Sequence, residues 1–248
     1  KKQFTDRLFE YNLHDAYEFD LKEKGGSRSS LRNSWTIHDL YSTAIGYSIK
    51  ETPLNMLAFY NAIANDGKMV KPHLIESFEK DGKVVRKHEP EILNGSICSK
   101  ATADSLTRAL TMVTLEGTAA TRLKNAKCVV GGKTGTARMV LNKEERAGSS
   151  DPFISASGKK KHQGTFVGFF PADEPKYTAI VTIWSGLTSQ NFYGGTYPAA
   201  AFKEIVDALW SLDKGWGEVI SETGRIPEME TRFIEKESGT GLPVPDLK

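Results

Sequence analysis

The amino-acid sequence predicts an α+β fold that contains an antiparallel sheet, and three observations support this expectation. Residues 165–170 and 177–184 are two short runs rich in aromatic and β-branched residues, and the segment between them holds two prolines, which is typical of an antiparallel hairpin. Residues 131–137 follow the apolar pair Val129-Val130 and form a third candidate strand. Helix start signals followed by apolar residues at helical spacing occur at 52–53, 99 and 196–198.

The composition indicates a globular chain and argues against a nucleic-acid-binding surface. The 248 residues are enough for one large domain or two small ones, and 39% of them are hydrophobic. Lys and Arg number 33 against 31 Asp and Glu, and the basic residues are not clustered as nucleic-acid binding requires. No apolar run approaches the roughly 20 residues of a membrane-spanning helix. Cys98 and Cys128 form no CxxC motif, which favours two buried thiols over a disulfide.

The N-terminal half is expected to contain helices and one hairpin. Thr52 is a good N-cap, and Pro53 suits the first helical position because the N–H that proline lacks would be unpaired there. This helix is expected to stop at the Asn-Asp-Gly of 65–67. The other predicted elements are helices over 4–12, 37–44 and 101–116, the last capped by Ser99, and strand-like arms over 69–78 and 84–87 around Asp81-Gly82.

In the C-terminal half, a long polar loop over 139–164 separates two of the predicted strands. It carries three Gly, one Pro and mixed charges, and loops longer than about 12 to 15 residues are often functional or mobile. A last strong helix is expected from 196–198 through Trp210. The sequence therefore predicts one domain over 1–212, followed by a weakly structured tail or linker over 213–248.

Residues 131–137, Gly-Gly-Lys-Thr-Gly-Thr-Ala, combine glycines and polar groups at a density that is unusual for a strand that only packs. A phosphate-binding P-loop would need Gly five residues before Gly132, and that position is Lys127. A Gly-rich buried strand or loop is one open interpretation. The other is a strand that accepts an extended substrate along its edge. In that case Gly135 permits close backbone approach, while Lys133 and Thr134 offer a positive charge and a hydroxyl to a carboxylate.

Lys133-Thr134-Gly135 resembles the third signature of the penicillin-recognising serine acyltransferases. Further segments occur in the order seen in class B penicillin-binding proteins, the monofunctional peptidoglycan transpeptidases of cell division and elongation. They are Ala44-Ile45-Gly46-Tyr47, Thr52-Pro53-Leu54, Asn61 to Lys68, Pro72-His73, Glu116-Gly117-Thr118, Gly132 to Ala137 and Phe166 to Ala172. The resemblance covers roughly residues 1–210. It implies a five-stranded antiparallel sheet with helices on both faces.

The resemblance also implies roles for four residues. Lys133 would orient the substrate and support proton transfer, and Thr134 would hold the terminal carboxylate of a D-Ala-D-Ala stem peptide or of a β-lactam. Gly135 would let the substrate approach, and the backbone N–H of Thr136 would form one half of an oxyanion hole. Losing one such hydrogen-bond donor typically lowers the rate by about 10² to 10³. No cofactor is implied. The parent protein is expected to work with the cell-wall synthesis machinery at the extracytoplasmic face of the cytoplasmic membrane, through an N-terminal anchor.

The family's other two motifs have no convincing counterpart here. Formal S-x-x-K matches occur at Ser77/Lys80, Ser157/Lys160 and Ser211/Lys214, and the S-x-N match is Ser189-Gln190-Asn191. None opens a predicted helix upstream of Lys133, so we interpret all four as coincidence. The chain is therefore expected to be the C-terminal part of a transpeptidase domain that lacks its first strands and its nucleophile helix, and to be inactive alone. The end of the tail, 242–247, weakly resembles the start of a PASTA-type module.

The expected loss of the first strands has a structural consequence. In the family's sheet they flank the strand that corresponds to 177–184, which is apolar here. An unpaired apolar edge favours aggregation or pairing with another chain. We therefore expect the outer edge of 177–184 to be covered by another chain or by a rearranged segment.

Several alternatives remain open on the sequence alone. A β-lactamase or D,D-carboxypeptidase of the same fold would share Lys133-Thr134-Gly135, and a non-catalytic β-lactam-sensing or scaffold domain would keep the strand without the chemistry. Arg138 follows the motif directly and is either a substrate contact or a solvated arginine. The five histidines have no metal-ligand spacing, so no metal site is expected.

Overall fold

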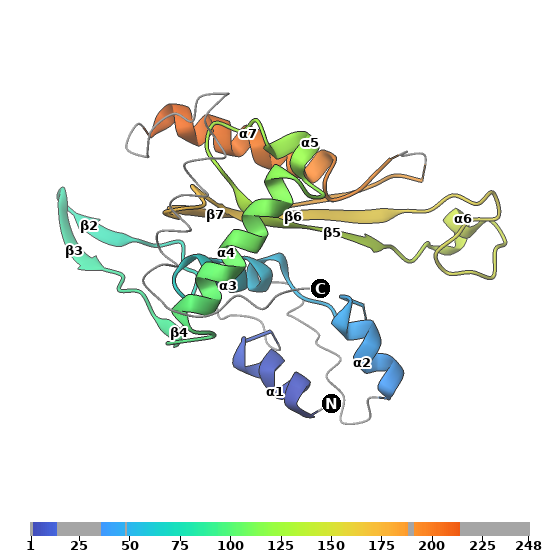
Figure 1. Cartoon of the computed structure of the whole chain (residues 1–248), viewed down its shortest axis with the longest axis horizontal. Helices are drawn as coiled ribbons and strands as arrows, with labels where there is room; N and C mark the ends of the chain where they lie inside the picture. Colours follow the sequence, from blue (N-terminus) through green and yellow to red (C-terminus); the bar gives the residue numbers. More distant parts are fainter. Residues whose placement is uncertain (1, 14–35, 48, 188–190, 214–248) are drawn as a thin grey trace, which may run out of the picture.

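The computed structural model describes residues 2–13, 36–47, 49–187 and 191–213 (Figure 1). The sheet strands and hairpin strands are β1 (Met69–Val70), β2 (Ser77–Lys80), β3 (Lys83–Lys87), β4 (Ile92–Asn94), β5 (Gly131–Arg138), β6 (His162–Phe170) and β7 (Tyr177–Trp184). The helices are α1 (Lys2–Glu10), α2 (Ile37–Ala44), α3 (Pro53–Ala64), α4 (Lys100–Leu115), α5 (Ala120–Leu123), α6 (Lys143–Arg146) and α7 (Tyr197–Leu212). Of the predicted tail over 213–248, residues 214–248 lie outside the described residues.

Capping hydrogen bonds confirm the predicted helix starts at Thr52 and Ser99, whereas α7 begins at the predicted position without a side-chain cap. The Thr52 side chain accepts a hydrogen bond from the Asn55 amide at the start of α3, where Pro53 occupies the first turn. The Ser99 side chain accepts one from the Thr102 amide at the start of α4. The chain leaves α3 through Asp66 and Gly67, both with positive φ, as the Asn-Asp-Gly sequence predicts.

The central sheet is antiparallel in the order β5-β6-β7. Its register pairs Lys133 with Val167 and Thr134 with Phe166 across β5 and β6, and pairs Phe166 with Val181 across β6 and β7. The predicted hairpin is thus confirmed, with β7 at the predicted bounds. β6 begins three residues before the predicted start, at His162, because pairing with β5 continues through residues that carry no apolar pattern.

Helices cover both faces of this sheet (Figure 1). Since successive side chains of a strand point to opposite faces, Phe166 and Phe170 of β6 lie on one face and Phe169 on the other. The first two pack in a core with Phe202 of α7, and Phe169 packs in a second core with residues of α3 such as Ala62. All of these side chains are fully buried. These two cores fix the sheet, and hence β5, between α7 and α3.

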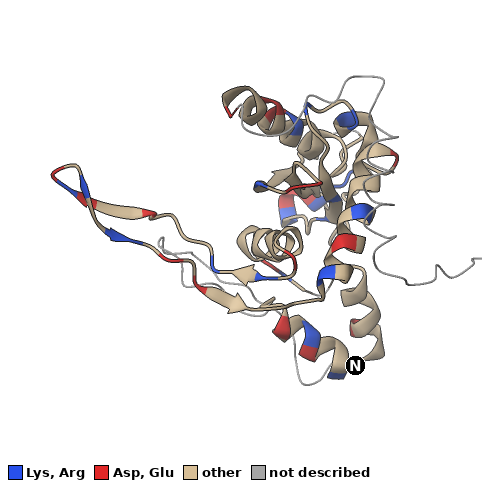
Figure 2. Ribbon diagram, turned by 60° about the vertical axis from the view of Figure 1, so that its left-hand side comes forward, with Lys and Arg blue, Asp and Glu red and all other residues tan. Residues whose placement is uncertain are grey.

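The segment after α3 differs from the prediction of one continuous strand over 69–78. It forms two strands, because β1 pairs with β4 whereas β2 pairs with β3 around Asp81-Gly82. Pro72 lies in the break, where it cannot donate to a ladder. The β2–β3 hairpin projects from the body of the protein (Figure 2), and every residue of β3 is exposed. Strand β4 was not predicted.

The predicted long loop after β5 is partly ordered by its own contacts. It contains the short helix α6, whose N-cap Asn142 exchanges hydrogen bonds with Glu145. Lys161 donates to the Glu145 carboxylate at 2.7 Å, which, together with the Asn142 amide, lowers the pKa of Glu145. Leu141 is buried within the loop. The connection between β5 and β6 is therefore a folded protrusion at one end of the sheet.

Two further expectations concern cysteine pairing and the sheet edge. Cys98 and Cys128 form no disulfide, as expected, but only Cys128 is buried and Cys98 is half-buried. Among the described segments none pairs with the outer edge of β7, so covering of that edge by another chain stays a prediction. No helix within the described ranges is long and apolar enough to cross a membrane.

Candidate functional site

The four predicted site residues lie together on β5, at one end of the described sheet order. Lys133, Gly135 and Thr136 are exposed and Thr134 is half-buried, whereas Gly131 and Gly132 are buried. The first two residues of β5 are therefore buried, and the strand becomes accessible to solvent from Lys133 onward. Close packing explains the first two glycines, because a Cβ on Gly132 would lie 2.5 Å from the ring of Phe166.

The backbone of β5 directs the amides of alternate residues to opposite edges. Beyond the end of the strand, the Met139 amide donates to the Lys161 carbonyl, in the same register that pairs Arg138 with His162. In an antiparallel ladder, residues two apart point their N–H and C=O groups to the same edge. The backbone N–H and C=O groups therefore point toward β6 at residues 133, 135, 137 and 139. Those of Thr134 and Thr136 point to the outer edge of β5.

The side chains of Lys133 and Thr134 meet at this outer edge. Lys133 Nζ donates to the Thr134 carbonyl at 2.9 Å and lies 3.5 Å from Thr134 Oγ1. Thr134 Oγ1 also lies 2.9 Å from Thr118 Oγ1, at the turn between α4 and α5. The edge thus presents an ammonium and two hydroxyls, donors suited to a carboxylate that binds as an extra strand would.

The segment before α7 packs against the face of β5 that carries the Thr134 and Thr136 side chains. The Gly194 amide donates to Thr136 Oγ1 at 3.0 Å. A Cβ on Gly194 would lie 2.4 Å from the Gly135 carbonyl oxygen, and a Cβ on Gly195 would lie 2.2 Å from the Thr118 carbonyl oxygen. The hydroxyl of Thr136 is therefore engaged in a structural contact, while its amide faces the strand edge.

The sequence did not predict the parts played by Thr118, Gly194 and Gly195. Each lies in or beside a segment that the sequence pattern singles out, although that pattern does not indicate a contact with β5. Thr118 belongs to the Glu-Gly-Thr segment that supported the family resemblance, and the Gly194-Gly195 pair directly precedes the helix start at 196–198. Their proximity to β5 arises from chain segments 16 and 58 residues away in sequence, which local patterns do not reveal.

The serines of the three formal S-x-x-K matches lie where the sequence led us to discount them. Ser77 and Lys80 lie on the projecting strand β2, and Ser157 lies in the loop before β6, with its hydroxyl 3.1 Å from Ser155 Oγ. Ser211 lies in the last turn of α7. Lys214 and the Ser189-Gln190 pair lie outside the described residues.

Arg138 and His162 pair across the far end of β5 and β6. Burial, followed by the positive charges of Arg138 and Lys160, lowers the pKa of the His162 imidazole. Arg138 is exposed and lies five residues beyond Lys133, past the contacts described above. Within the described ranges no group of three His, Cys, Asp or Glu side chains could hold a metal ion.

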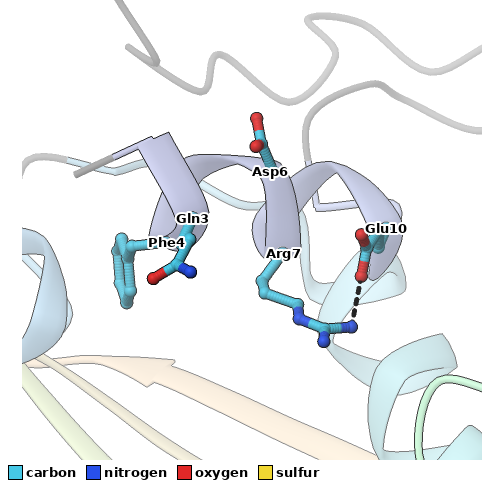
Figure 3. A pocket seen from close by; sticks show the side chains of 5 residues that line it. All are labelled: Gln3, Phe4, Asp6, Arg7 and Glu10. Carbon is cyan, nitrogen blue, oxygen red and sulfur yellow. Dashed lines mark hydrogen bonds and ion pairs between the residues drawn. The ribbon is translucent and has the colours of Figure 1, made fainter.

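A hollow of about 530 Å³ lies beside α1, lined by Gln3, Phe4, Asp6, Arg7 and Glu10 (Figure 3). Arg7 pairs with Glu10, and Asp6 pairs with Lys2 on the same short helix. Each charged group of this hollow is therefore paired with an opposite charge on α1, and its described lining contains none of the predicted site residues.

The family profile described as "Penicillin binding protein transpeptidase domain" matches residues 4–207. Penicillin-binding protein 2A of Bacillus subtilis (strain 168) is 27% identical over 217 residues, which are 84% of this chain and 28% of the relative. A probable peptidoglycan D,D-transpeptidase PenA of Neisseria flavescens is 29% identical over 192 residues, which are 75% of this chain and 42% of the relative. The chain thus spans less than half the length of either protein.

Solved structures share the fold. Penicillin-binding protein 3 of Mycobacterium tuberculosis, complexed with aztreonam, superposes with a TM-score of 0.68 at 23% identity, over 88% of this chain and 48% of that one. Penicillin-binding protein 2B of Streptococcus pneumoniae (strain R6) superposes with a TM-score of 0.66 at 19% identity, over 88% and 33%.

Proposed function

We propose that this chain, which belongs to the penicillin-binding protein transpeptidase domain family and is similar to its class B members, supplies the substrate-docking wall of a serine D,D-transpeptidase. The observation that carries the proposal is the outer edge of β5. There the Lys133 ammonium and the Thr134 hydroxyl lie beside the outward-facing backbone of Thr134 and Thr136. A stem peptide bound along this edge would have its terminal carboxylate at Thr134.

The reaction is acyl transfer through a serine ester. The serine oxygen attacks the carbonyl carbon of the penultimate D-Ala, its proton passes to a base, and the terminal D-Ala leaves with a proton on its amine. The amine of a second stem peptide then attacks the ester and releases the serine. The Thr136 N–H would donate a hydrogen bond to the oxyanion that forms in each attack. Lys133 would orient the substrate and support the proton transfers.

The serine nucleophile and the S-x-N motif belong, in this proposal, to a part of the protein outside residues 1–248. The serines of the three S-x-x-K matches lie on β2, in the loop before β6 and in the last turn of α7, and none of them opens a helix. The chain corresponds to the C-terminal part of the transpeptidase domain over 1–212, with a tail or linker over 213–248. Alone, it is expected to be inactive.

Two of the relatives support a proposal for the substrates, and the family resemblance supports one for the partners and the place of action. One relative is named as a probable peptidoglycan D,D-transpeptidase, and one solved structure of the fold holds the β-lactam aztreonam. We infer that the protein binds D-Ala-D-Ala stem peptides and β-lactams, works with the cell-wall synthesis machinery, and acts outside the cytoplasmic membrane through an N-terminal anchor. No cofactor is required by this chemistry.

Labelling with a fluorescent penicillin tests the proposal. The longer protein, with the segment upstream of residue 1 included, should be labelled stoichiometrically on one serine in that segment, identified by peptide mass spectrometry. Residues 1–248 alone should remain unlabelled under the same conditions. Stoichiometric labelling of residues 1–248, or a labelled serine within them, would contradict the proposed division of the site.

Turnover of a chromogenic cephalosporin distinguishes a β-lactamase of the same fold. A transpeptidase forms a long-lived acyl-enzyme, so the longer protein should release about one equivalent of product and then stop. Continued hydrolysis would identify a β-lactamase. The absence of both labelling and turnover would favour a non-catalytic domain.

A further inference from the structure

We infer that Thr118 is a positioning residue, whose hydroxyl fixes the direction in which Thr134 donates its proton to a bound carboxylate. This inference rests on the proposed function, because it assumes that a substrate carboxylate binds at Thr134. Thr118 lies between α4 and α5, 16 residues before Thr134 in sequence. Its Oγ1 lies 2.9 Å from Thr134 Oγ1, at the accessible surface.

Hydrogen-bond capacity determines the direction of this contact. A hydroxyl has one proton to donate and two lone pairs to accept with, whereas an ammonium only donates and an ionised carboxylate only accepts. Either Thr118 or Thr134 can be the donor when no ligand is bound. Once a carboxylate occupies the site, Thr134 must donate to it. Thr118 must then donate to Thr134.

Lys133 reinforces the same direction. Its ammonium lies 3.5 Å from Thr134 Oγ1, at the outer limit of a hydrogen bond, and can only donate. With Thr118 and Lys133 as donors, both lone pairs of Thr134 Oγ1 are engaged. The single remaining interaction of that hydroxyl is donation of its proton, which is the interaction a carboxylate needs. Hydrogen-bond chains of this kind also strengthen one another by polarisation.

The backbone holds Thr118 in place for this role. The neighbouring Ala119 amide donates to the Val113 carbonyl at 3.1 Å, which anchors the turn to the end of α4. Gly195 packs directly over the Thr118 carbonyl and against Thr134, since its Cβ would lie 2.2 Å from Thr118 O and 3.5 Å from Thr134 Cγ2. The two hydroxyls are thus held together from three chain segments.

The test measures the second-order rate of acylation of the longer protein by a fluorescent penicillin that carries a free carboxylate. Thr118→Val keeps the side-chain shape and removes the hydroxyl, so acylation should fall by about threefold to tenfold, the range expected for one net hydrogen bond. Thr118→Ser keeps the hydroxyl and should stay within about twofold of the original rate. Because Thr118 is exposed, both variants should fold, and Thr118→Ala provides a second hydroxyl-free variant.

A double-mutant cycle separates positioning from a general structural effect. Thr134→Val removes the hydroxyl that Thr118 is inferred to direct, so Thr118→Val should cause no further loss in that background. Equal losses for Thr118→Val and Thr118→Ser, an unchanged rate in Thr118→Val, or the same loss with and without the Thr134 hydroxyl would each overturn the inference. Failure of the unsubstituted protein to be acylated would instead overturn the proposed function, and this inference with it.

Discussion

The Gly194 amide donates a hydrogen bond to the Thr136 hydroxyl at 3.0 Å and ties the segment before α7 to the accessible half of β5. This contact joins two parts of the chain 58 residues apart. It fixes the Thr136 side chain on one face of the strand, while alternation places its amide at the outer edge. The geometry of the proposed oxyanion donor therefore depends on a segment outside the Lys-Thr-Gly motif.

Gly194→Ala is expected to disturb both the fold and the site. Its Cβ would meet the Gly135 and Thr165 carbonyl oxygens at 2.4 Å, so backbone must shift, at a cost of about 1–3 kcal/mol of unfolding free energy. The rate of penicillin acylation of the longer protein should fall as well. Gly95→Ala is the matched control, because a Cβ there meets nothing within 4 Å. A Gly194→Ala protein with unchanged stability and acylation would contradict the packing described here.

Phe202→Ala tests the core that holds the sheet against α7. Phe202 is fully buried and its ring lies 4.7 Å from that of Phe166, edge to face. Removing it should lower the unfolding free energy by about 3–5 kcal/mol, the usual cost of a large cavity. Phe78→Ala on the projecting hairpin removes a ring that is 46% exposed and should cost far less. Denaturant unfolding of the two variants should rank them in this order.

His162 predicts a pH dependence of stability. Its pKa is lowered from the ordinary value near 6.5, so the unfolded state binds more protons than the folded state between the lowered pKa and about 6.5. The unfolding free energy therefore has its full value, as far as His162 is concerned, above about pH 6.5. It decreases as the pH falls from there toward the lowered pKa. Thermal unfolding of the longer protein between pH 5 and 7.5 should show this decline, and His162→Gln should reduce its slope. An unchanged slope would show that other groups cause the decline.

Much of the fold could be predicted because its signals are local. Thr52 and Ser99 cap their helices through hydrogen bonds to residues three positions away, so the sequence alone indicates where α3 and α4 begin. The apolar and β-branched pattern of 177–184 likewise gives the bounds of β7. The break between β1 and β2 and the presence of β4 were not predicted, because β1 and β4 are only two or three residues long and are defined by pairing with each other.

The site was predictable only in part, for a related reason. Lys133 and Thr134 belong to a contiguous motif, so their proximity is guaranteed by the chain. Thr118 and Gly194 reach β5 through tertiary packing, and neither carries a local pattern that indicates this contact. The face of β5 that each residue occupies depends on the register with β6, which only the structure provides.

Lys133→Ala in the longer protein tests the central claim, that the outer edge of β5 is a wall of an acyl-transfer site. Lys133 is exposed and its ammonium hydrogen-bonds to the neighbouring Thr134, so the substitution should leave the thermal unfolding temperature nearly unchanged. The rate of acylation by a fluorescent penicillin should fall by about 10² or more, the scale of losing one preorganised donor. Acylation of a folded Lys133→Ala protein at the unsubstituted rate would contradict the claim.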